Sequence, residues 1–598
     1  MDYQKCRNLV ALFLDQAQAK GDRPFLWAKR DGTYRPTSWR AAAQEVTALA
    51  RGLKALGIRP GDRVGLVSEN RPKWLIADLG IMAAGAITVP AFTTNTVDDH
   101  RHILANSGAR AVIVSTSALS QRVIPAADQV TTIDTIIAMD GMPGGQVSHA
   151  EIRNWDDVIA LGQTQPDDIT ASAERIGRDD IACLIYTSGT GGVPRGVMTS
   201  HANILANCRG AYRLLESIGY GDEVFLCFLP LSHSYEHTAG MIFPISLGAE
   251  IYFAEGADTL GANMIEARPT IMTAVPRLYE TLHQRILRGI ERQGGLRAKL
   301  FFRALELGRK HYDDPKSLSL RERIANALLD RLVRKSVAAR FGGRLKAMVS
   351  GGAPLNPEIG KFFLALGVPL LQGYGQTEAA PVISANPPKR IKIHTVGPAL
   401  DGVEVKIAED GEILVRGELV MRGYWNDPEA SQRALEGGWL HTGDVGLLDS
   451  DGYLQITDRK RDFIKNSGGD MVSPARIEGY LTLRSEIAQA MVFGDRYPYL
   501  VAVIVPRQEF LESFARERAL APDLAQLAEN PDLHKAINAA LIQVNAELTP
   551  TERVRRFILA GEAFTTANGQ MTPTLKIKRH AIRHAYGEAL LKLYDLKA

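Results

Sequence analysis

The sequence predicts an α/β protein: a large N-terminal domain of mostly parallel sheets flanked by helices, with a short-strand β subdomain, and a smaller α+β C-terminal domain. Three observations lead to this prediction. The 598 residues allow about four structural units. The first 260 residues alternate short β-branched runs with helical patterns, and short strands replace this alternation from about residue 404. The composition, 45% hydrophobic and 23% charged, is that of an ordinary folded chain.

Strands at 64–67, 86–89, 111–114 and 132–138 are predicted from runs of β-branched and other apolar residues. Residues 74–84, between the first two runs, have the pattern of a helix. Strand, helix and strand at this spacing favour βαβ units and therefore parallel sheets. An antiparallel α+β arrangement is the alternative that this pattern leaves open.

Residues 283–346 differ from the rest of the chain in charge. They contain 17 Lys and Arg against six Asp and Glu, whereas the whole chain has a net charge of +3. Apolar residues recur there at helical spacing in two sets, Leu296, Leu300, Ala304 and Leu307, and Ile324, Leu328 and Leu332. We predict a basic helical excursion, which is either a solvated helix pair without a partner or a surface for an anionic membrane.

Short strands follow beyond residue 402. They are predicted at 403–407, 412–415 and 453–456, and then near 490–493 and 501–505. The charged run 458–462 separates the first three from the last two. We therefore expect a large domain at 1–460, which contains the excursion, and a small domain at 461–598.

Net charge and cysteine spacing exclude several classes of protein. A charge of +3 is too close to neutral for a nucleic-acid binder. Four scattered cysteines without a CxxC pair argue against a disulfide framework and a Cys-rich zinc site. The apolar run 9–14 is too short for a signal peptide, and no run reaches 18 apolar residues. We expect a cytoplasmic protein, with the inner face of a membrane as a peripheral site.

The segment 184–197, LIYTSGTGGVPRGV, is the strongest local motif. An apolar strand leads into a loop of hydroxyl groups and glycines, followed by the cation Arg195 and a helical pattern at 202–215. Backbone N–H groups exposed by glycine, together with hydroxyls and a cation, suit a polyphosphate. The GxxxxGK[ST] pattern is absent, so this is a different kind of phosphate loop. The candidate nucleotide ligands in it are Thr187, Ser188, Gly189, Thr190 and Gly192.

This string resembles the phosphate-loop signature of the adenylate-forming (AMP-binding) enzymes, which include acyl-CoA synthetases, luciferases and peptide-synthetase adenylation domains. The family pattern is approximately YTSGTTGxPKG. Gly191 stands where Thr is usual and Arg195 where Lys is usual, which predicts altered nucleotide affinity rather than lost function. The resemblance covers residues 10–590, because further family motifs follow in the expected order.

The motif 373–378, GYGQTE, resembles the adenine and metal motif of the family. The resemblance implies that Tyr374 and Gly375 contact adenine and that Thr377 contacts the α-phosphate. It also implies that Glu378 and the Ser188 hydroxyl hold Mg²⁺, a hard cation that needs few protein oxygens when it bridges phosphates.

Two further motifs resemble nucleotide-binding segments of the family. SGGAP at 350–354 implies that Gly351, Gly352 and Ala353 lie along adenine and the acyl group, where small residues permit close approach. WLHTGD at 439–444 implies that Asp444 accepts hydrogen bonds from both ribose hydroxyls, with Arg459 joining it.

The C-terminal motif MTPTLKIKR at 571–579 resembles that of long-chain acyl-CoA synthetases. It implies that Lys576 reaches the site during adenylation, while Lys578 and Arg579 face solvent. By the same resemblance Arg461 is the hinge of a mobile small domain. After rotation the loop 464–469 would meet coenzyme A, through Lys465, Ser467, Gly468 and Gly469.

The implied reaction joins a carboxylic acid to ATP and then to a thiol. Attack of the carboxylate on the α-phosphate gives an acyl-adenylate and pyrophosphate, and AMP is then a good leaving group for the thiol of coenzyme A. Lys576, Arg195 and Mg²⁺, with Glu378 and Thr377, are where we expect the compensating charge. Fatty acid, ATP and coenzyme A are the expected partners, and no nucleic acid is expected.

The segment 229–240 resembles the lining of the family's acyl pocket. His233 matches a position often occupied by His or an aromatic residue, although a structural histidine is the alternative, and His237 falls near the position of the fatty-acyl gate. Ser234 stands where amino-acid-activating relatives usually place Asp, which argues against an amino acid substrate. The string VPR at 275–277, the basic excursion and TPTLKIKR at 572–579 together most resemble long-chain fatty acyl-CoA synthetases of bacterial type.

Two other functions stay open at this point. One is a ligase that loads the acyl group onto an acyl carrier protein. The other is a non-catalytic nucleotide-binding relative, against which the presence of Glu378, Asp444, Arg459 and Lys576 argues. The sequence leaves the acyl chain length and the oligomeric state undetermined.

Overall fold

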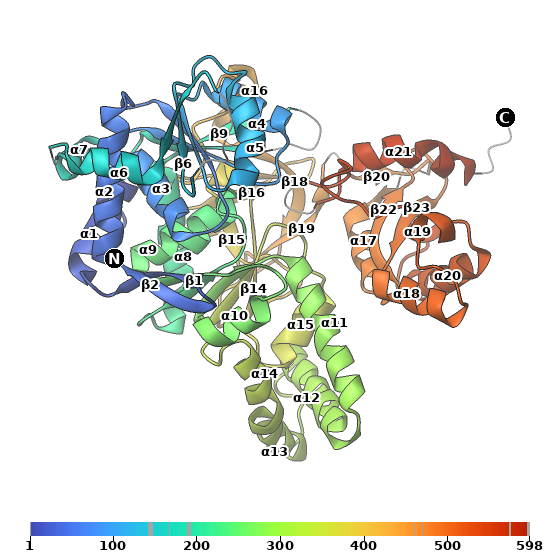
Figure 1. The fold of residues 1–598 in the computed structure, drawn as a ribbon. Helices are drawn as coiled ribbons and strands as arrows, with labels where there is room; N and C mark the ends of the chain where they lie inside the picture. Colours follow the sequence, from blue (N-terminus) through green and yellow to red (C-terminus); the bar gives the residue numbers. More distant parts are fainter. Residues whose placement is uncertain are drawn as a thin grey trace.

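A computed structural model describes residues 2–141, 148–166, 168–187, 193–460, 462–468, 470–572 and 576–594. It confirms the predicted α/β class: two large sheets, a β subdomain and a helical protrusion form one body, and the C-terminal unit lies beside it (Figure 1). Among these residues no helix combines the length and apolarity needed to cross a bilayer.

The first sheet has seven strands in the order β7-β6-β5-β3-β4-β8-β9, of which β9 alone runs antiparallel. The strands predicted in the N-terminal region all belong to it, which confirms the βαβ interpretation there. Their bounds are β3 Arg63–Val67, β4 Ile87–Ala91, β5 Ala111–Val114, β6 Thr135–Ala138, β7 Glu151–Asn154, β8 Ile181–Thr187 and β9 Arg195–Ser200.

Helices cover this sheet on both faces. Two of them start at clear capping signals: Thr96 and Asp99 form a capping box at the start of α4, as Ser200 and Asn203 do at the start of α8. The helices are α1 Leu9–Lys20, α2 Trp39–Ala55, α3 Pro72–Ala83, α4 Val97–Ser107, α5 Ser117–Ala127, α6 Trp155–Gln163, α7 Ile169–Arg175 and α8 His201–Leu215.

The second sheet has eight strands in the order β15-β14-β13-β12-β10-β11-β1-β2, parallel except at its two edges. One hydrophobic core includes residues of both sheets and of α1, α2, α3 and α8, so the sheets form a single domain. The strands are β1 Pro24–Arg30, β2 Thr33–Ser38, β10 Val224–Cys227, β11 Glu250–Phe253, β12 Ile271–Ala274, β13 Ala347–Ser350, β14 Leu370–Gly375 and β15 Val382–Ala385. The helical elements along it are η1 Glu216–Ile218, the π-helix η2 Glu236–Ile242, α9 Phe243–Leu247, α10 Leu260–Ala267, α15 Pro357–Ala365 and η4 Thr377–Ala379.

Segment 283–346 is helical, as predicted, and protrudes from the second sheet (Figure 1). It consists of α11 Pro276–Gln293, α12 Gly295–Asp313, α13 Leu320–Leu329, η3 Asp330–Arg334 and α14 Lys335–Arg340. Ala304 and Leu307 of the first predicted apolar set are buried against Leu329, but Leu296 is 71% exposed. Ile324, Leu328 and Leu332, the second predicted set, are exposed rather than packed.

An antiparallel β subdomain, β16-β17-β18-β19, follows the second sheet. Its elements are β16 Glu404–Ile407, β17 Glu412–Arg416, α16 Pro428–Ala434, η5 Glu436–Gly438, β18 Leu440–Leu448 and β19 Leu454–Arg459.

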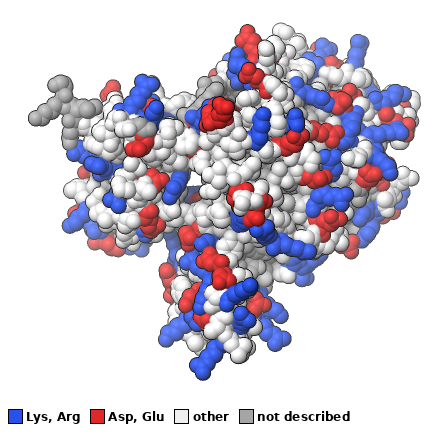
Figure 2. Space-filling model, turned by 180° about the vertical axis from the view of Figure 1, so that it is seen from behind, with Lys and Arg blue, Asp and Glu red and all other residues white. Residues whose placement is uncertain are grey.

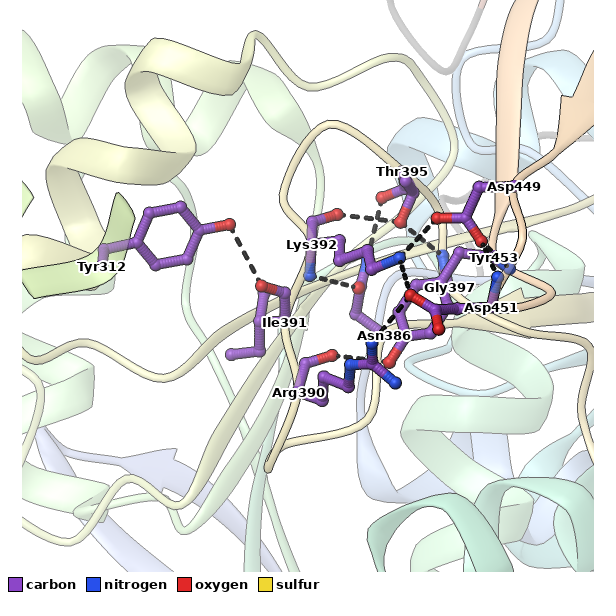
Figure 3. A network of polar contacts seen from close by, with 10 residues as sticks. All are labelled: Tyr312, Asn386, Arg390, Ile391, Lys392, Thr395, Gly397, Asp449, Asp451 and Tyr453. Carbon is purple, nitrogen blue, oxygen red and sulfur yellow. Dashed lines mark hydrogen bonds and ion pairs between the residues drawn. The ribbon is translucent and has the colours of Figure 1, made fainter. Parts of the chain in front are cut away.

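A polar network fixes this subdomain to the rest of the large body (Figure 3). The Lys392 ammonium donates to Asp449 and Asp451 in the β18–β19 turn, at 2.5 Å each, and lies 4.5 Å from the ring centroid of Tyr453. The Tyr312 hydroxyl of α12 donates to the Ile391 carbonyl at 3.1 Å. The loop before the subdomain therefore links the helical excursion to β18 and β19, the strands that carry two of the candidate nucleotide ligands.

The C-terminal unit has its own sheets and cores. A hairpin, β20-β21, precedes the three-stranded sheet β22-β23-β24, and two hydrophobic clusters pack on the faces of that sheet. The elements are β20 Ile464–Lys465, β21 Met471–Val472, α17 Pro474–Thr482, β22 Ile487–Phe493, β23 Leu500–Pro506, α18 Gln508–Glu517, α19 Leu524–Leu527, α20 Pro531–Ala546, β24 Val554–Leu559 and α21 Arg579–Lys592.

Candidate active site

Strand β14 and the short helix η4 carry the predicted adenine and metal motif. Tyr374 and Gly375 end the strand, and Thr377 and Glu378 begin η4. A Cβ atom at Gly375 would lie 1.8 Å from the Pro381 carbonyl oxygen, so the turn back into β15 requires glycine here. Gly375 is therefore required by the close approach of the backbone at Pro381, in addition to its expected contact with adenine.

The predicted ribose carboxylate lies at the junction of β14, β18 and β19. Asp444 of β18 pairs in register with Arg459 of β19, whose Nε lies 3.5 Å from Asp444 Oδ1. The Tyr374 hydroxyl donates to Asp444 Oδ2 at 2.5 Å. Burial raises the pKa of Asp444, while the Arg459 cation and the tyrosine hydroxyl act to lower it. This arrangement holds a carboxylate in place and orients it as a hydrogen-bond acceptor.

Glu378 is linked to Arg195 through an aromatic residue that the sequence analysis did not identify. The Tyr424 hydroxyl donates to Glu378 Oε1 at 2.9 Å, and the Arg195 guanidinium lies 5.6 Å from the Tyr424 ring centroid. Arg195 Nε also pairs with Asp427 at 3.0 Å. Burial raises the pKa of Glu378. Only aromatic character in the run 422–425, RGYW, could have indicated Tyr424 as a site residue.

Lys576 comes from the C-terminal unit and acts on residues of the large body. Its charge interacts with Arg459, Asp444 and Glu378, and it depresses the pKa of His233. Burial, followed by the Arg459 cation, lowers the pKa of Lys576 to about 8, while the two carboxylates act to raise it. The structure therefore brings Lys576, Glu378, Asp444 and Arg459 together, although they are up to 198 residues apart in the chain.

The two predicted acyl-pocket histidines have different surroundings. Burial lowers the pKa of His233 to about 4, and its Nδ1 accepts from the Tyr235 N–H at 3.2 Å. His237 is fully buried in η2, with its Nε2 3.0 Å from Asp78 Oδ2. A gating role for His237, which stays a prediction, requires this buried pair to open.

The predicted glycine turn SGGAP follows strand β13. A Cβ atom at Gly351 would lie 3.0 Å from the Tyr235 ring, and Gly352 has a φ of +80°. Ala353 is exposed beside it. Near this turn the hydroxyls of Ser234 and Thr377 lie 3.0 Å apart, so Ser234 contacts a predicted α-phosphate ligand.

The loop predicted to meet coenzyme A lies in the C-terminal unit. Lys465 ends β20, and Ser467 and Gly468 follow it in exposed positions. The backbone N–H of Ser467 donates to the Tyr497 carbonyl at 3.0 Å, which fixes the loop against the unit's core. In this orientation of the two parts Lys576 acts on the residues of the large body.

Several predicted residues lie outside the described part of the chain. Thr187 ends β8 and pairs in register with Arg195, but the phosphate-loop residues after it are not described. The predicted residues concerned are Ser188, Gly189, Thr190 and Gly192, with Gly191, and also the hinge Arg461 and Gly469.

One expectation was wrong. Arg579 does not face solvent: it forms a two-bond ion pair with Glu478 of α17, at 2.6 and 2.7 Å. Its side chain is 23% exposed and that of Glu478 12%. Because α21 begins at Arg579, this pair fixes the segment that carries Lys576 to the body of the C-terminal unit.

The donor set suits a hard cation that also binds phosphate. In the described residues no group of three or more His, Cys, Asp or Glu could enclose a metal by itself. Glu378 offers a half-buried carboxylate whose pKa is raised by desolvation, so a nearby cation would stabilise its charged form. A Mg²⁺ ion with substrate phosphates as its other ligands fits such a site.

Most of the chain is similar to known protein families. Residues 13–425 match the AMP-binding enzyme family, and residues 461–598 match the AMP-binding enzyme C-terminal domain. Long-chain-fatty-acid–CoA ligase FadD15 of Mycobacterium bovis is 30% identical over 98% of this chain and 97% of its own. The peroxisomal long chain acyl-CoA synthetase 6 of Arabidopsis thaliana is 30% identical over 94% of this chain and 82% of its own.

Solved structures share the fold. The adenylation domain of a carboxylate reductase from Mycobacterium chelonae has a TM-score of 0.76 at 24% identity, covering 99% of this chain and 91% of its own. The corresponding domain from Segniliparus rugosus, in complex with AMP and a co-purified carboxylic acid, has a TM-score of 0.77 at 22% identity. The match covers 99% of this chain and 94% of that domain's chain. At these identities the likeness concerns the fold. The family matches cover most of the chain, and the chain belongs to the AMP-binding enzyme family.

Proposed function

We propose that this protein is a long-chain fatty acid–CoA ligase that activates a fatty acid with ATP and transfers the acyl group to coenzyme A. One observation carries the proposal: the charge of Lys576, in the C-terminal unit, interacts with Glu378, Asp444 and Arg459 of the large body. The full-length relatives named long-chain-fatty-acid–CoA ligase supply the substrate class.

In the first step a carboxylate oxygen of the fatty acid attacks the α-phosphorus of ATP, and pyrophosphate leaves. Asp444 accepts from the ribose hydroxyls, and Thr377 and Lys576 donate to the phosphate on which negative charge develops. Arg195 supplies a second cation from β9, where Tyr424 and Asp427 hold it. Most of the rate enhancement comes from positioning and from this fixed charge.

Glu378, with the Ser188 hydroxyl, would hold Mg²⁺. The ion, when bound, neutralises the charge that develops between the α- and β-phosphates. Tyr424 orients Glu378 for this purpose through its hydroxyl. Tyr424 thus acts on Glu378, which would bind the Mg²⁺ ion, and Arg195 acts on the phosphates.

In the second step the thiolate of coenzyme A attacks the acyl carbon, and AMP leaves. We propose that the C-terminal unit rotates about Arg461, which withdraws Lys576 and presents Lys465, Ser467, Gly468 and Gly469 to the pantetheine arm. Ser473 supports a reversible junction: it caps α17 and its hydroxyl donates to Asp458 Oδ2 of the large body.

The acid is proposed to be a fatty acid rather than an amino acid. Ser234 carries no charge to hold an amine and is hydrogen-bonded to Thr377. His233 is half-buried, and its depressed pKa keeps it neutral near pH 7, which suits the entrance of an apolar pocket.

A two-part assay tests the function. Exchange of labelled pyrophosphate into ATP, measured with acids of increasing chain length, should appear with long-chain fatty acids. Thioester should then form with coenzyme A. Exchange without thioester, but with acyl transfer to a pantetheinylated carrier protein, would favour the acyl carrier function. Absence of exchange with every acid would contradict the proposal.

The excursion 283–346 is proposed to contact an anionic membrane, from which long acyl chains are drawn. Leu320, Ile324, Leu328 and Leu332 are 57–75% exposed along α13 and η3. Arg321, Arg331 and Lys335 are exposed on the same helical segment, and in the described part of the chain their side chains have no ion-pair or hydrogen-bond partner. Figure 2 shows Lys and Arg side chains gathered at the end of this protrusion. Apolar residues interspersed with unpaired cations match the chemistry of an anionic lipid surface.

A further inference from the structure

A cavity of about 270 Å³ lies between α11 and the C-terminal unit, and none of the predicted site residues lines it. One wall is a single face of α11, with Arg277, Arg285 and Arg288 at helical spacing. The other wall is the start of α18, with Arg507, Gln508 and Glu509. In Figure 1 α11 is the helix of the excursion that faces the C-terminal unit.

The charges in this groove are incompletely balanced. Arg277 pairs with Glu280 at 3.2 Å, and Arg288 pairs across the groove with Glu509 at 3.6 Å. Arg285 has no side-chain partner among the residues that the structure describes. The four arginines and one glutamate that line the groove therefore give it a net positive charge, most of it on the α11 wall.

Arg507 adds a buried donor to the lining of the cavity. It is only 8% exposed, and its Nε and Nη2 donate to the carbonyls of Ser485 and Ile487 at 3.2 and 2.8 Å. In the described residues its Nη1 has no partner, although the residue lines the cavity. Arg507 is also the N-cap residue of the ten-residue helix α18, whose first turn has no side-chain cap. The amide groups there are free to bind an anion.

We propose that this groove binds a phosphate group, held by Arg285 and Arg288 of α11 on one side and by Arg507 and the first turn of α18 on the other. Arginine is suited to this role because its planar guanidinium donates two parallel hydrogen bonds to phosphate oxygens. Inorganic phosphate and a phosphate monoester, such as that of coenzyme A, present the same chemistry.

The bound phosphate stabilises the present orientation of the two units. Its ligands come from both units, so the complete site exists only when they lie as they do here, with Lys576 at the active site. A ligand that binds one orientation more tightly shifts the population toward it. Phosphate is therefore a regulator that favours the first step over the second. This regulatory part, unlike the binding, rests on the rotation proposed above.

Calorimetric titration with inorganic phosphate, at constant ionic strength and without nucleotide, tests the binding. Arg285→Ala should weaken the affinity about tenfold, the loss expected for a charge-assisted hydrogen bond. Arg292→Ala, an exposed arginine of α11 outside the groove, is the matched control and should leave it unchanged. Equal affinities in the wild type and Arg285→Ala would overturn the proposal.

A second titration with adenosine 3′,5′-bisphosphate separates the two sources. If the bisphosphate binds more tightly than inorganic phosphate, and Arg285→Ala weakens this binding, the site is assigned to a nucleotide monoester. If the bisphosphate binds no more tightly than inorganic phosphate, the site is assigned to the free anion. Binding that Arg285→Ala leaves intact would count against the groove.

The orientation is measured by spin labels at Lys316→Cys and Lys535→Cys, two exposed positions on either side of the groove, in a Cys6→Ser background. Phosphate should narrow the distance distribution to a single population, and Arg285→Ala should abolish this effect. A distribution that phosphate leaves unchanged would reject the regulatory part. No fatty acid is present in these experiments, so their outcome is independent of the proposed catalytic function.

Discussion

At the scale of single residues, Lys576 has the most specific role. In the proposed mechanism its cation serves the first step only, so Lys576→Ala should lower pyrophosphate exchange by about 10²–10³-fold, as the loss of one fixed charge-stabilising contact does. Thioester formation from a supplied acyl-adenylate should change far less. Lys578→Ala is the matched control, and an equal loss in both half-reactions would argue against an adenylation-specific role.

The lowered pKa of Lys576 predicts an alkaline limit to the first step. The protonated form is present below the pKa of about 8 and is lost as pH rises through it. The kcat/KM for exchange should therefore fall above about pH 8, because this quantity reports the free enzyme. In Lys576→Arg the side chain stays charged at this pH, so the fall in kcat/KM above about pH 8 should disappear even if the rate is lower. If kcat/KM falls in the same way in Lys576→Arg, another group is responsible for the fall.

The ion pair between Arg579 and Glu478 predicts non-additive effects on stability. Removing one partner leaves a largely buried charge, so Arg579→Met should destabilise the C-terminal unit by about 1–3 kcal/mol. Glu478→Gln combined with Arg579→Met should cost less than Arg579→Met alone, because no unpaired charge remains and a glutamine can still accept from the Val492 N–H. Urea unfolding of the single and double variants measures this, and additive losses would contradict it.

At the scale of elements, glycine positions the helices that cover the first sheet. A Cβ atom at Gly162 of α6 would lie 1.8 Å from the Ala48 carbonyl oxygen of α2, so these helices touch backbone to backbone. Gly162→Ala should cost about 1–3 kcal/mol through overpacking, seen as a lower melting temperature.

Gly289 is the matched control for this prediction. It lies within α11, and a Cβ atom there would meet nothing within 4 Å. Gly289→Ala should stabilise the helix by about 0.5–1 kcal/mol because alanine has the higher helix propensity. If both substitutions changed the melting temperature in the same direction, close packing at Gly162 would not be the cause.

For the molecule as a whole, the excursion is unusual because several of its large apolar side chains are exposed and do not pack in a hydrophobic core. Ile324→Asn with Leu328→Asn should reduce co-sedimentation with vesicles of anionic lipid by removing inserted apolar area. Replacing Arg321, Arg331 and Lys335 by Gln should weaken binding to these vesicles by about 1 kcal/mol per residue. The binding of this variant should also depend less on salt.

Ile542→Asn supplies the control for vesicle binding. Ile542 is 61% exposed on α20 of the C-terminal unit, away from the excursion. The Ile542→Asn substitution should leave co-sedimentation with the vesicles unchanged. Binding that is indifferent to salt, lipid charge and all excursion variants would reject the membrane contact and leave a solvated helical protrusion.

The fold class was predictable from the amino-acid sequence, and so was the identity of several residues that the structure brings together. Parallel strands such as β3, β4 and β5 were predictable because buried β-branched runs depend on local composition. Glu378, Asp444 and Lys576 were identified because ordered motifs keep their spacing in the chain. Their roles remain predictions, and the phosphate loop after Thr187 lies outside the described residues.

Contacts between residues that are far apart in the chain became visible in the structure alone. It paired Glu378 with Tyr424, Arg579 with Glu478 and His237 with Asp78, and none of these pairs has a spacing that marks it in the chain. It also exposed Ile324 and Leu328, since a helical apolar face looks the same in sequence whether a neighbour covers it or not. Periodicity is a local property of the chain, whereas burial and charge pairing depend on what the rest of the fold places opposite each residue.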